Sequence, residues 1–213
     1  MISVSLQRPW LVAGLPRAMR CLSHAPFEAG YVMADRVVWR EVRNADLGPD
    51  FAVGPWFAGE MAAYPGAVGM LTSRDVGSYR LETVVVEGVR AACLVTLGLS
   101  NAEAVGTRRP YHTAEYGTIN LCVAVEAGLT ECAQLEALCV AVQARTAGVM
   151  AAGLALDTGV ATGTGTDCVV LACDAGVDAF AGLHTAVGEA VGACVLAAVS
   201  GAATDWVEWR ARV

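Results

Sequence analysis

The first half of the chain alternates short apolar runs with turn residues, a pattern typical of β-strands. Glu87-Gly88 separates two runs rich in β-branched residues, which are therefore expected to form a hairpin. The stretch 44–65 contains several prolines and glycines and is predicted as a loop. The candidate strands cover residues 2–6, 10–13, 18–22, 35–43, 68–72, 79–86 and 89–97.

The second half changes to a helical period. After a strand predicted at 118–125, Thr130 is a plausible N-cap with Glu131 in the favourable first turn. A buried strand is expected at 167–173 and a second helix at 185–200. The first helix has apolar residues at helical spacing and polar residues between them. The apolar set is Leu135, Leu138, Cys139, Val142, Val149 and Met150, and the polar set is Glu131, Gln134, Glu136, Gln143 and Arg145.

Strands that come first and long helices that come later favour an α+β class of fold. We predict a single domain, residues 1–213, in which a mixed or antiparallel sheet is covered by two long helices from the C-terminal half. A chain of this length buries enough surface to fold without a metal or a disulfide.

Composition narrows the functional classes. The net charge of -7 argues against a nucleic-acid partner, which requires a basic face, and against docking on anionic lipid. The first residues lack the layout of a secretory signal, so we expect a cytoplasmic protein. The stretch 186–203 approaches membrane-spanning length with Glu189 as its one charge, but its small residues favour a buried helix over a membrane partner. Homo-oligomerisation is left open.

The eight cysteines show no CxxC spacing, and most lie in apolar runs. A free cysteine in such a run behaves as a small hydrophobic residue, so reduced core thiols are expected. Cys132 and Cys139 are one heptad apart and could share a helix face, but no Cys-His cluster accompanies them. No protein-bound metal is therefore predicted.

Four polar motifs interrupt the apolar pattern, at residues 22–26, 98–102, 116–120 and 161–167. Each places hydroxyl or amide groups at the edge of a predicted element, where binding groups are usually displayed. Each also has a purely structural explanation, such as a turn or a strand end. The motif at 161–167 is not a P-loop, because no lysine follows its last glycine. Its backbone N–H groups and hydroxyls suit amide carbonyls or a developing oxyanion.

The ionisable candidates are few. The three histidines are His24, His112 and His184, and imidazole is a suitable proton carrier at neutral pH. His184 precedes the helix that carries Glu189, whose small apolar neighbours would raise its pKa if they bury it; an exposed helix edge is the alternative. Asp167 opens a buried strand and either accepts backbone N–H bonds or orients a catalytic group.

In their order along nearly the whole chain, these motifs resemble the adenosylcobinamide amidohydrolase family. The resemblance is carried by residues 22–26 with Gly30, 69–73, 98–102, 117–120 and 161–167, and by His184-Thr185 with Gly188-Glu189. It implies hydrolysis of adenosylcobinamide to adenosylcobyric acid and aminopropanol, in corrinoid salvage and cobamide remodelling. It implies no separate cofactor, because the corrinoid cobalt enters with the substrate.

One position departs from the family pattern. The first long helix ends in Thr-Glu-Ala-Lys in the family, whereas residues 142–145 here read Val-Gln-Ala-Arg. Gln143 cannot ionise, so a catalytic role for that position is in doubt and a structural role is easier to support.

Amide hydrolysis needs an activated nucleophile, a proton for the leaving amine and donors for the oxyanion. The acid or base candidates that activate water are Glu189, His184 and Asp167; a second hypothesis makes Thr118 a covalent nucleophile. The residues expected to bind the substrate are His24, Ser73, Asn101, Asn120, Thr162, Thr164 and Thr166. A non-catalytic corrinoid-binding protein and an amidohydrolase of another small amide remain alternatives.

Overall fold

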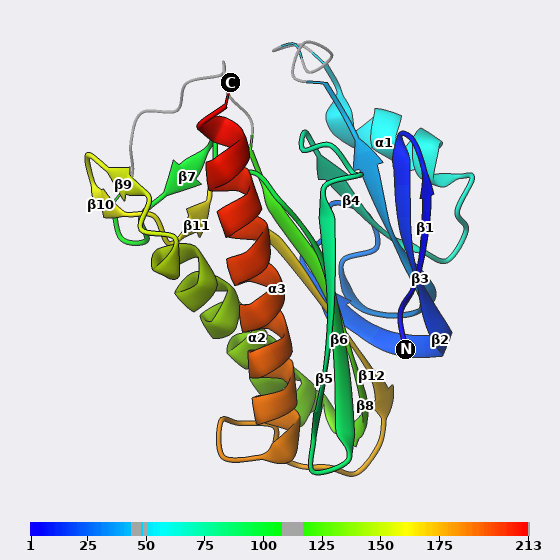
Figure 1. The fold of residues 1–213 in the computed structure, drawn as a ribbon. Helices are drawn as coiled ribbons and strands as arrows, with labels where there is room; N and C mark the ends of the chain where they lie inside the picture. Colours follow the sequence, from blue (N-terminus) through cyan, green and yellow to red (C-terminus); the bar gives the residue numbers. More distant parts are fainter. Residues whose placement is uncertain (44–47, 49–50, 108–116, 213) are drawn as a thin grey trace.

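The computed structural model describes residues 1–43, 48, 51–107 and 117–212. One large sheet has the strand order β4-β3-β2-β12-β8-β6-β5, with β1 paired to β2 (Figure 1). Its strands are β1 (Ser3–Gln7), β2 (Trp10–Ser23), β3 (Gly30–Glu41), β4 (Val68–Thr72), β5 (Tyr79–Val86), β6 (Val89–Leu97), β8 (Ile119–Leu129) and β12 (Cys168–Ala175). The helices are α1 (Val53–Met61), α2 (Glu131–Ala151) and α3 (Ala186–Arg210).

The sheet is mixed, as predicted. The pairs β3–β4 and β8–β12 are parallel, and the other pairs of the sheet are antiparallel. The hairpin predicted around Glu87-Gly88 is formed by β5 and β6, and Glu87 (φ 48°) and Gly88 (φ 87°) both occupy the left-handed region that a type I′ turn requires. Two short ribbons, β7 (Ala102–Glu103) with β11 (Gly163–Thr164) and β9 (Ala155–Leu156) with β10 (Gly159–Val160), lie outside the sheet.

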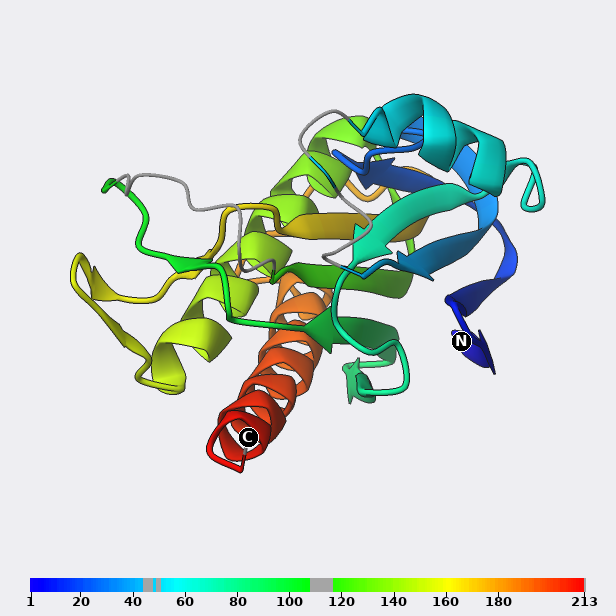
Figure 2. The same cartoon turned by 90° about the horizontal axis from the view of Figure 1, so that it is seen from above.

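Helices α2 and α3 pack side by side on one face of the sheet (Figures 1 and 2). Alternate side chains of β8, including Ile119, Leu121 and Val123, point to this face and are fully buried. Thr130 caps α2 as predicted, because its Oγ1 accepts from the Ala133 N–H (3.2 Å). The two long helices of the predicted α+β domain are thus confirmed.

The face by which α2 packs agrees with the prediction only in part: Val149 is fully buried and Leu138 and Val142 pack against the core, but Cys139 and Met150 are exposed. Leu135 is 50% exposed, whereas Gln134 is fully buried and Ala137 and Ala141 fill the contact layer. One reason is the close approach of α3: a Cβ added to Gly148 would lie 2.9 Å from a Val199 methyl carbon, so a larger residue does not fit at this position. The largest apolar side chains therefore do not mark the core face of α2.

Helix α3 extends to Arg210, ten residues beyond the predicted end. It is long and apolar enough to cross a membrane by composition alone. In the structure it packs against α2, β5 and β6, and 56% of its most apolar stretch is buried in the protein. The interpretation of this segment as a core helix is confirmed.

On the opposite face, the sheet bends so that β2 and β3 pack against β6 and β8. Trp39 of β3 and Leu11 of β2 share one buried cluster with Leu94 of β6 and Cys122 of β8, although these pairs of strands are not neighbours in the sheet. Strand β2 is one strand of 14 residues rather than the two predicted, and its pairing with β3 shifts register between Gly14 and Met19. This irregularity lets the sheet bend so that its β4–β3 edge approaches β8.

Helix α1 lies within the stretch predicted as a loop. Its N-cap position, Ala52, makes no side-chain capping bond, and its first turn contains no acidic residue. Phe57 and Met61, one turn apart, are buried against Val38 and Ala67. This helix is stabilised by tertiary packing rather than by local signals, so the sequence alone did not reveal it.

Candidate active site

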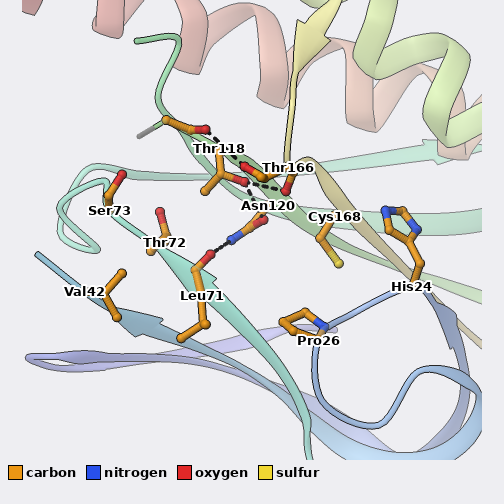
Figure 3. A pocket seen from close by; sticks show the side chains of 11 residues that line it. His24, Pro26, Val42, Leu71, Thr72, Ser73, Thr118, Asn120, Thr166 and Cys168 are labelled. Carbon is orange, nitrogen blue, oxygen red and sulfur yellow. Dashed lines mark hydrogen bonds between the residues drawn. The ribbon is translucent and has the colours of Figure 1, made fainter. Parts of the chain in front are cut away.

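A cavity of about 350 Å³ opens where the bent edge of the sheet meets the starts of β8 and β12 (Figure 3). It combines a few hydroxyl, amide and imidazole groups with an apolar wall, the usual make-up of a small-molecule site. Its lining residues are His24, Pro26, Val42, Leu71, Thr72, Ser73, Gly117, Thr118, Asn120, Thr166 and Cys168.

Backbone hydrogen bonds bring three of the four polar motifs together beside this cavity, and the His24 side chain joins the fourth to them. The Gly98 N–H donates to the Thr118 carbonyl (3.0 Å), and the Gly165 N–H donates to the Asn101 carbonyl (3.3 Å). Gly117 is required at the crossing, because a Cβ there would lie 2.8 Å from the Gly98 carbonyl oxygen. Motifs that are far apart in the sequence therefore form one continuous structure.

Thr118 and Asn120 form a buried polar chain across the cavity wall. The Thr118 Oγ1 lies 2.8 Å from the Thr166 carbonyl oxygen and 3.1 Å from the Asn120 Oδ1. The Asn120 Nδ2 donates to the Leu71 carbonyl (2.6 Å) and so connects β8 to β4, which do not pair in the sheet. Asn120 is 1% exposed and bonded at both ends of its amide. Asn120 braces the wall of the cavity that it lines, and its predicted role in substrate binding stays a prediction.

Asp167 lies behind the cavity in a ring of donors. Its carboxylate pairs with Arg145 of α2 (2.7 Å) and accepts the N–H groups of Thr164 (3.0 Å) and Ile119 (3.1 Å) and the Thr164 hydroxyl. Its side chain is 7% exposed. Burial raises the pKa of Asp167, while Arg145 and the other donors act in the opposite direction. These four donors surround the Asp167 carboxylate. We therefore infer that it anchors the loop 161–167.

His24 reaches the same loop from the end of β2. Its Nε2 lies 2.8 Å from the Asp167 carbonyl oxygen. A carbonyl oxygen only accepts, so Nε2 carries a proton, and in the neutral ring Nδ1 keeps a lone pair. His24 is exposed at the cavity mouth, where this lone pair can serve as a base.

Thr162, Thr164 and Asn101 do not line this cavity. The Thr162 hydroxyl accepts from the Val105 N–H (2.8 Å), and the Thr164 hydroxyl is held by Asp167. The Asn101 Nδ2 donates to the Gly117 carbonyl (3.4 Å). These three side chains hold the loops in place, and their role in substrate binding stays a prediction. Ser73 and Thr166, from the same prediction, do line the cavity.

His184 and Glu189 lie far from this cavity, and both are exposed. The segment that leads to them is attached to the far end of β8, where the Thr130 N–H donates to the Asp178 carbonyl (3.0 Å). Thr118 precedes the other end of that strand, about 33 Å away at the rise of a β-strand. The interpretation that these two residues share a cleft with the threonine and asparagine motifs is therefore corrected.

Two further expectations concern neighbouring positions. Gln143, the departure from the family pattern, is exposed on α2, in agreement with a non-catalytic position. Arg145, two residues later, was assigned to the polar face but is the partner of Asp167 and 15% exposed. The sequence around Arg145 gives no sign of this ion pair, because Asp167 lies outside α2. His112 lies outside the described residues.

Six of the eight cysteines are buried, as predicted from their apolar runs. Cys168 lines the cavity, but burial raises the pKa of its thiol to about 12. A thiol with such a pKa is almost wholly protonated at neutral pH and is a poor nucleophile. Within the described part of the chain, no three His, Cys, Asp or Glu residues gather closely enough to hold a metal ion.

These features define a class of protein: an α+β domain with a small-molecule cavity built from strand ends, hydroxyls and an imidazole. Comparison with known proteins gives the family. The model of the adenosylcobinamide amidohydrolase family matches residues 2–211, so the chain belongs to this family. It is 36% identical over 116 residues to an adenosylcobinamide amidohydrolase from Halobacterium salinarum, a match that spans 51% of this chain and 48% of that relative.

Proposed function

We propose that the protein hydrolyses the amide bond that joins aminopropanol to the corrin ring of adenosylcobinamide and releases adenosylcobyric acid. The observation that carries this proposal is the family match over residues 2–211. The cavity supports it, because it offers polar groups and an apolar wall that suit a short amide-bearing side chain of a large ligand.

In the reaction that we propose, the His24 Nδ1 accepts a proton from water while the water oxygen attacks the amide carbon. The tetrahedral intermediate collapses when the C–N bond breaks and His24 returns the proton to the leaving nitrogen. The Asp167 carbonyl holds the imidazole in the required tautomer through its 2.8 Å contact with Nε2. The orientation of the proposed base thus comes from one backbone contact.

Thr118 fits a positioning role better than that of a nucleophile. Its hydroxyl lies within hydrogen-bond distance of two oxygens, the Thr166 carbonyl and the Asn120 amide. Neither oxygen accepts a proton at neutral pH, so neither activates the hydroxyl for attack. We infer that Thr118 fixes the spacing between the starts of β8 and β12, against which the substrate amide lies.

The finer assignments belong to the same proposal. We place the reaction in the cytoplasm, in corrinoid salvage and cobamide remodelling, with the corrinoid cobalt as part of the substrate and no separate cofactor. The acidic net charge of -7 supports a small-molecule substrate in place of nucleic acid or anionic lipid.

Incubation of the purified protein with adenosylcobinamide, followed by chromatography, tests the proposal. We expect adenosylcobyric acid and aminopropanol in equal amounts. The His24→Gln variant is the matched control, because it removes the proposed base and keeps a polar side chain of similar length. Tight binding of the corrinoid without product in the wild type would instead identify a binding protein, and turnover of simple amides alone would identify a different amidohydrolase.

A further inference from the structure

The two edge strands of the large sheet have different surroundings. At the β4 edge, Gly69 exchanges two backbone hydrogen bonds with Phe27 (3.3 and 3.1 Å), and the Leu71 carbonyl accepts from the Asn120 side chain (2.6 Å). At the other edge, β5 pairs with β6 on one side, and no hydrogen bond from the described part of the chain reaches its other side (Figure 1). A strand of eight residues therefore ends the sheet with an open row of backbone groups.

A cysteine of α3 shows which backbone groups of β5 form this open row. The Cys194 Sγ lies 3.3 Å from the Glu82 carbonyl oxygen and 3.5 Å from the Ala91 carbonyl oxygen. One sulfur reaches both oxygens only if both point into the gap between β5 and β6. Because successive residues of a strand direct their N–H and C=O groups to opposite sides, the odd-numbered residues of β5 direct theirs outward. These residues include Leu81, Thr83 and Val85.

The side chains of these three residues lie on the face of the sheet away from α3. Val84 and Val86 pack against the core cluster on the α3 side, and successive side chains of a strand alternate between the two faces. Leu81 is 39% exposed, Val85 is 56% exposed, and Thr83 is also exposed. The strand has no proline, and its register with β6 has no bulge. It thus lacks common features that keep the edge of a sheet from pairing with another chain.

We propose that β5 pairs antiparallel with β5 of a second copy of this chain, about a two-fold axis at Thr83. This register places Leu81 of each copy opposite Val85 of the other and sets threonine opposite threonine, so that apolar and hydroxyl groups meet their own kind. A register centred one residue earlier would set Glu82 opposite Glu82, and like charges directly opposite destabilise a sheet. The sequence of β5 therefore selects the register.

Helix α3 leaves space for the second copy. It packs on both β5 and β6, so the two-fold axis would bring the two α3 helices to about 10 Å from each other, a distance at which helices pack. Such an approach requires small side chains. Ala193, Ala197 and Gly201 follow one another at successive turns of one face of α3, and both alanines are exposed. A Cβ on Gly201 would lie 3.8 Å from the Arg80 guanidinium carbon, which places this face beside β5.

Sedimentation equilibrium tests the proposed dimer with two variants of one residue. Thr83→Pro removes an outward N–H that the bonds to β6 do not use, and proline is tolerated at such a position of an edge strand. We expect wild-type protein to be a dimer and Thr83→Pro to raise the dissociation constant at least about tenfold, because two hydrogen bonds across the axis are lost. Thr83→Val keeps the N–H and is the matched control, with a dissociation constant close to wild type. Circular dichroism checks that each variant is folded.

A cross-link tests the register and does not depend on the folding of the proline variant. The Cα atoms of a hydrogen-bonded antiparallel pair lie about 5.5 Å apart, which a disulfide can span. Mild oxidation should therefore join two chains of Thr83→Cys. Val177→Cys, at a site 90% exposed, and wild-type protein with its exposed Cys132 and Cys139 are the controls, and both should cross-link far more slowly.

Two results would overturn the proposal. One is wild-type protein that stays monomeric at every concentration tested, and the other is a dimer that persists in Thr83→Pro and does not cross-link in Thr83→Cys. No residue of β5 lines the cavity of the candidate active site, so corrinoid hydrolysis is tested separately from this interface.

Discussion

The two ends of β8 carry similar kinds of residue and have opposite surroundings. At its start, Thr118 and Asn120 are buried, bonded and adjacent to a cavity. Beyond its other end, His184 and Glu189 are exposed. Both regions hold residues that could transfer protons. At the start of β8, elements from four parts of the sequence meet, whereas His184 and Glu189 belong to one loop and one helix. Convergence of elements, rather than the presence of ionisable residues, marks the candidate site.

The two histidines give the sharpest test of this comparison. We expect His24→Gln to lower kcat/KM for corrinoid hydrolysis about 10²- to 10⁴-fold, the usual contribution of a general base. His184→Gln should change it less than about twofold, because the side chain is exposed at the far end of the molecule. Thermal unfolding of both variants checks that each is folded. A large loss in His184→Gln would reverse the assignment of the two ends.

Substitution of the two acids Asp167 and Glu189 should lower the free energy of unfolding by different amounts. Asp167→Asn leaves the guanidinium of Arg145 without its partner and places an NH₂ group among donors, so the free energy of unfolding should fall by about 3–5 kcal/mol. Glu189→Gln should cost less than about 1 kcal/mol, since it removes an exposed charge from the first turn of α3. Urea denaturation measures both values. Equal losses would contradict an anchoring role for Asp167.

Variants of Thr118 distinguish a positioning role from nucleophilic attack by its hydroxyl. Thr118→Val removes the one hydroxyl proton shared by two buried oxygens, so the free energy of unfolding should fall by about 1–3 kcal/mol. Hydrolysis should remain measurable in Thr118→Val and be close to wild type in Thr118→Ser. Complete loss in the valine variant, together with a covalent adduct on the wild-type protein by mass spectrometry, would establish the nucleophile instead.

The smallest effect is expected from the cysteines. With a pKa of about 12, the Cys168 thiol is ionised in about one molecule in ten thousand at pH 8. Iodoacetamide should therefore modify the exposed Cys132 and Cys139 first and leave hydrolysis unchanged. Peptide mass mapping locates the modification. Rapid modification of Cys168 with loss of activity would show a reactive thiol in the cavity.

The predicted strands and helices were largely confirmed where the local pattern is repetitive. The residues of β4, β5 and β6 match the predicted ranges, because each is a continuous run of apolar or β-branched residues between turns. The helix α1 was not predicted, and the packed face of α2 was predicted only in part. Both depend on partners distant in the sequence, Val38 for Phe57 and Val199 for Gly148.

The sequence by itself determined the α+β class, the N-cap of α2 and the set of polar motifs, since these depend on local periodicity and residue chemistry. Only the tertiary structure decided which motifs meet. The bend of β2 brings β4 to β8, and there the Asn120 side chain reaches the Leu71 carbonyl. The pairing of Arg145 with Asp167 arises in the same way. A contact between residues far apart in the chain is fixed by packing, and packing leaves no local pattern in the sequence.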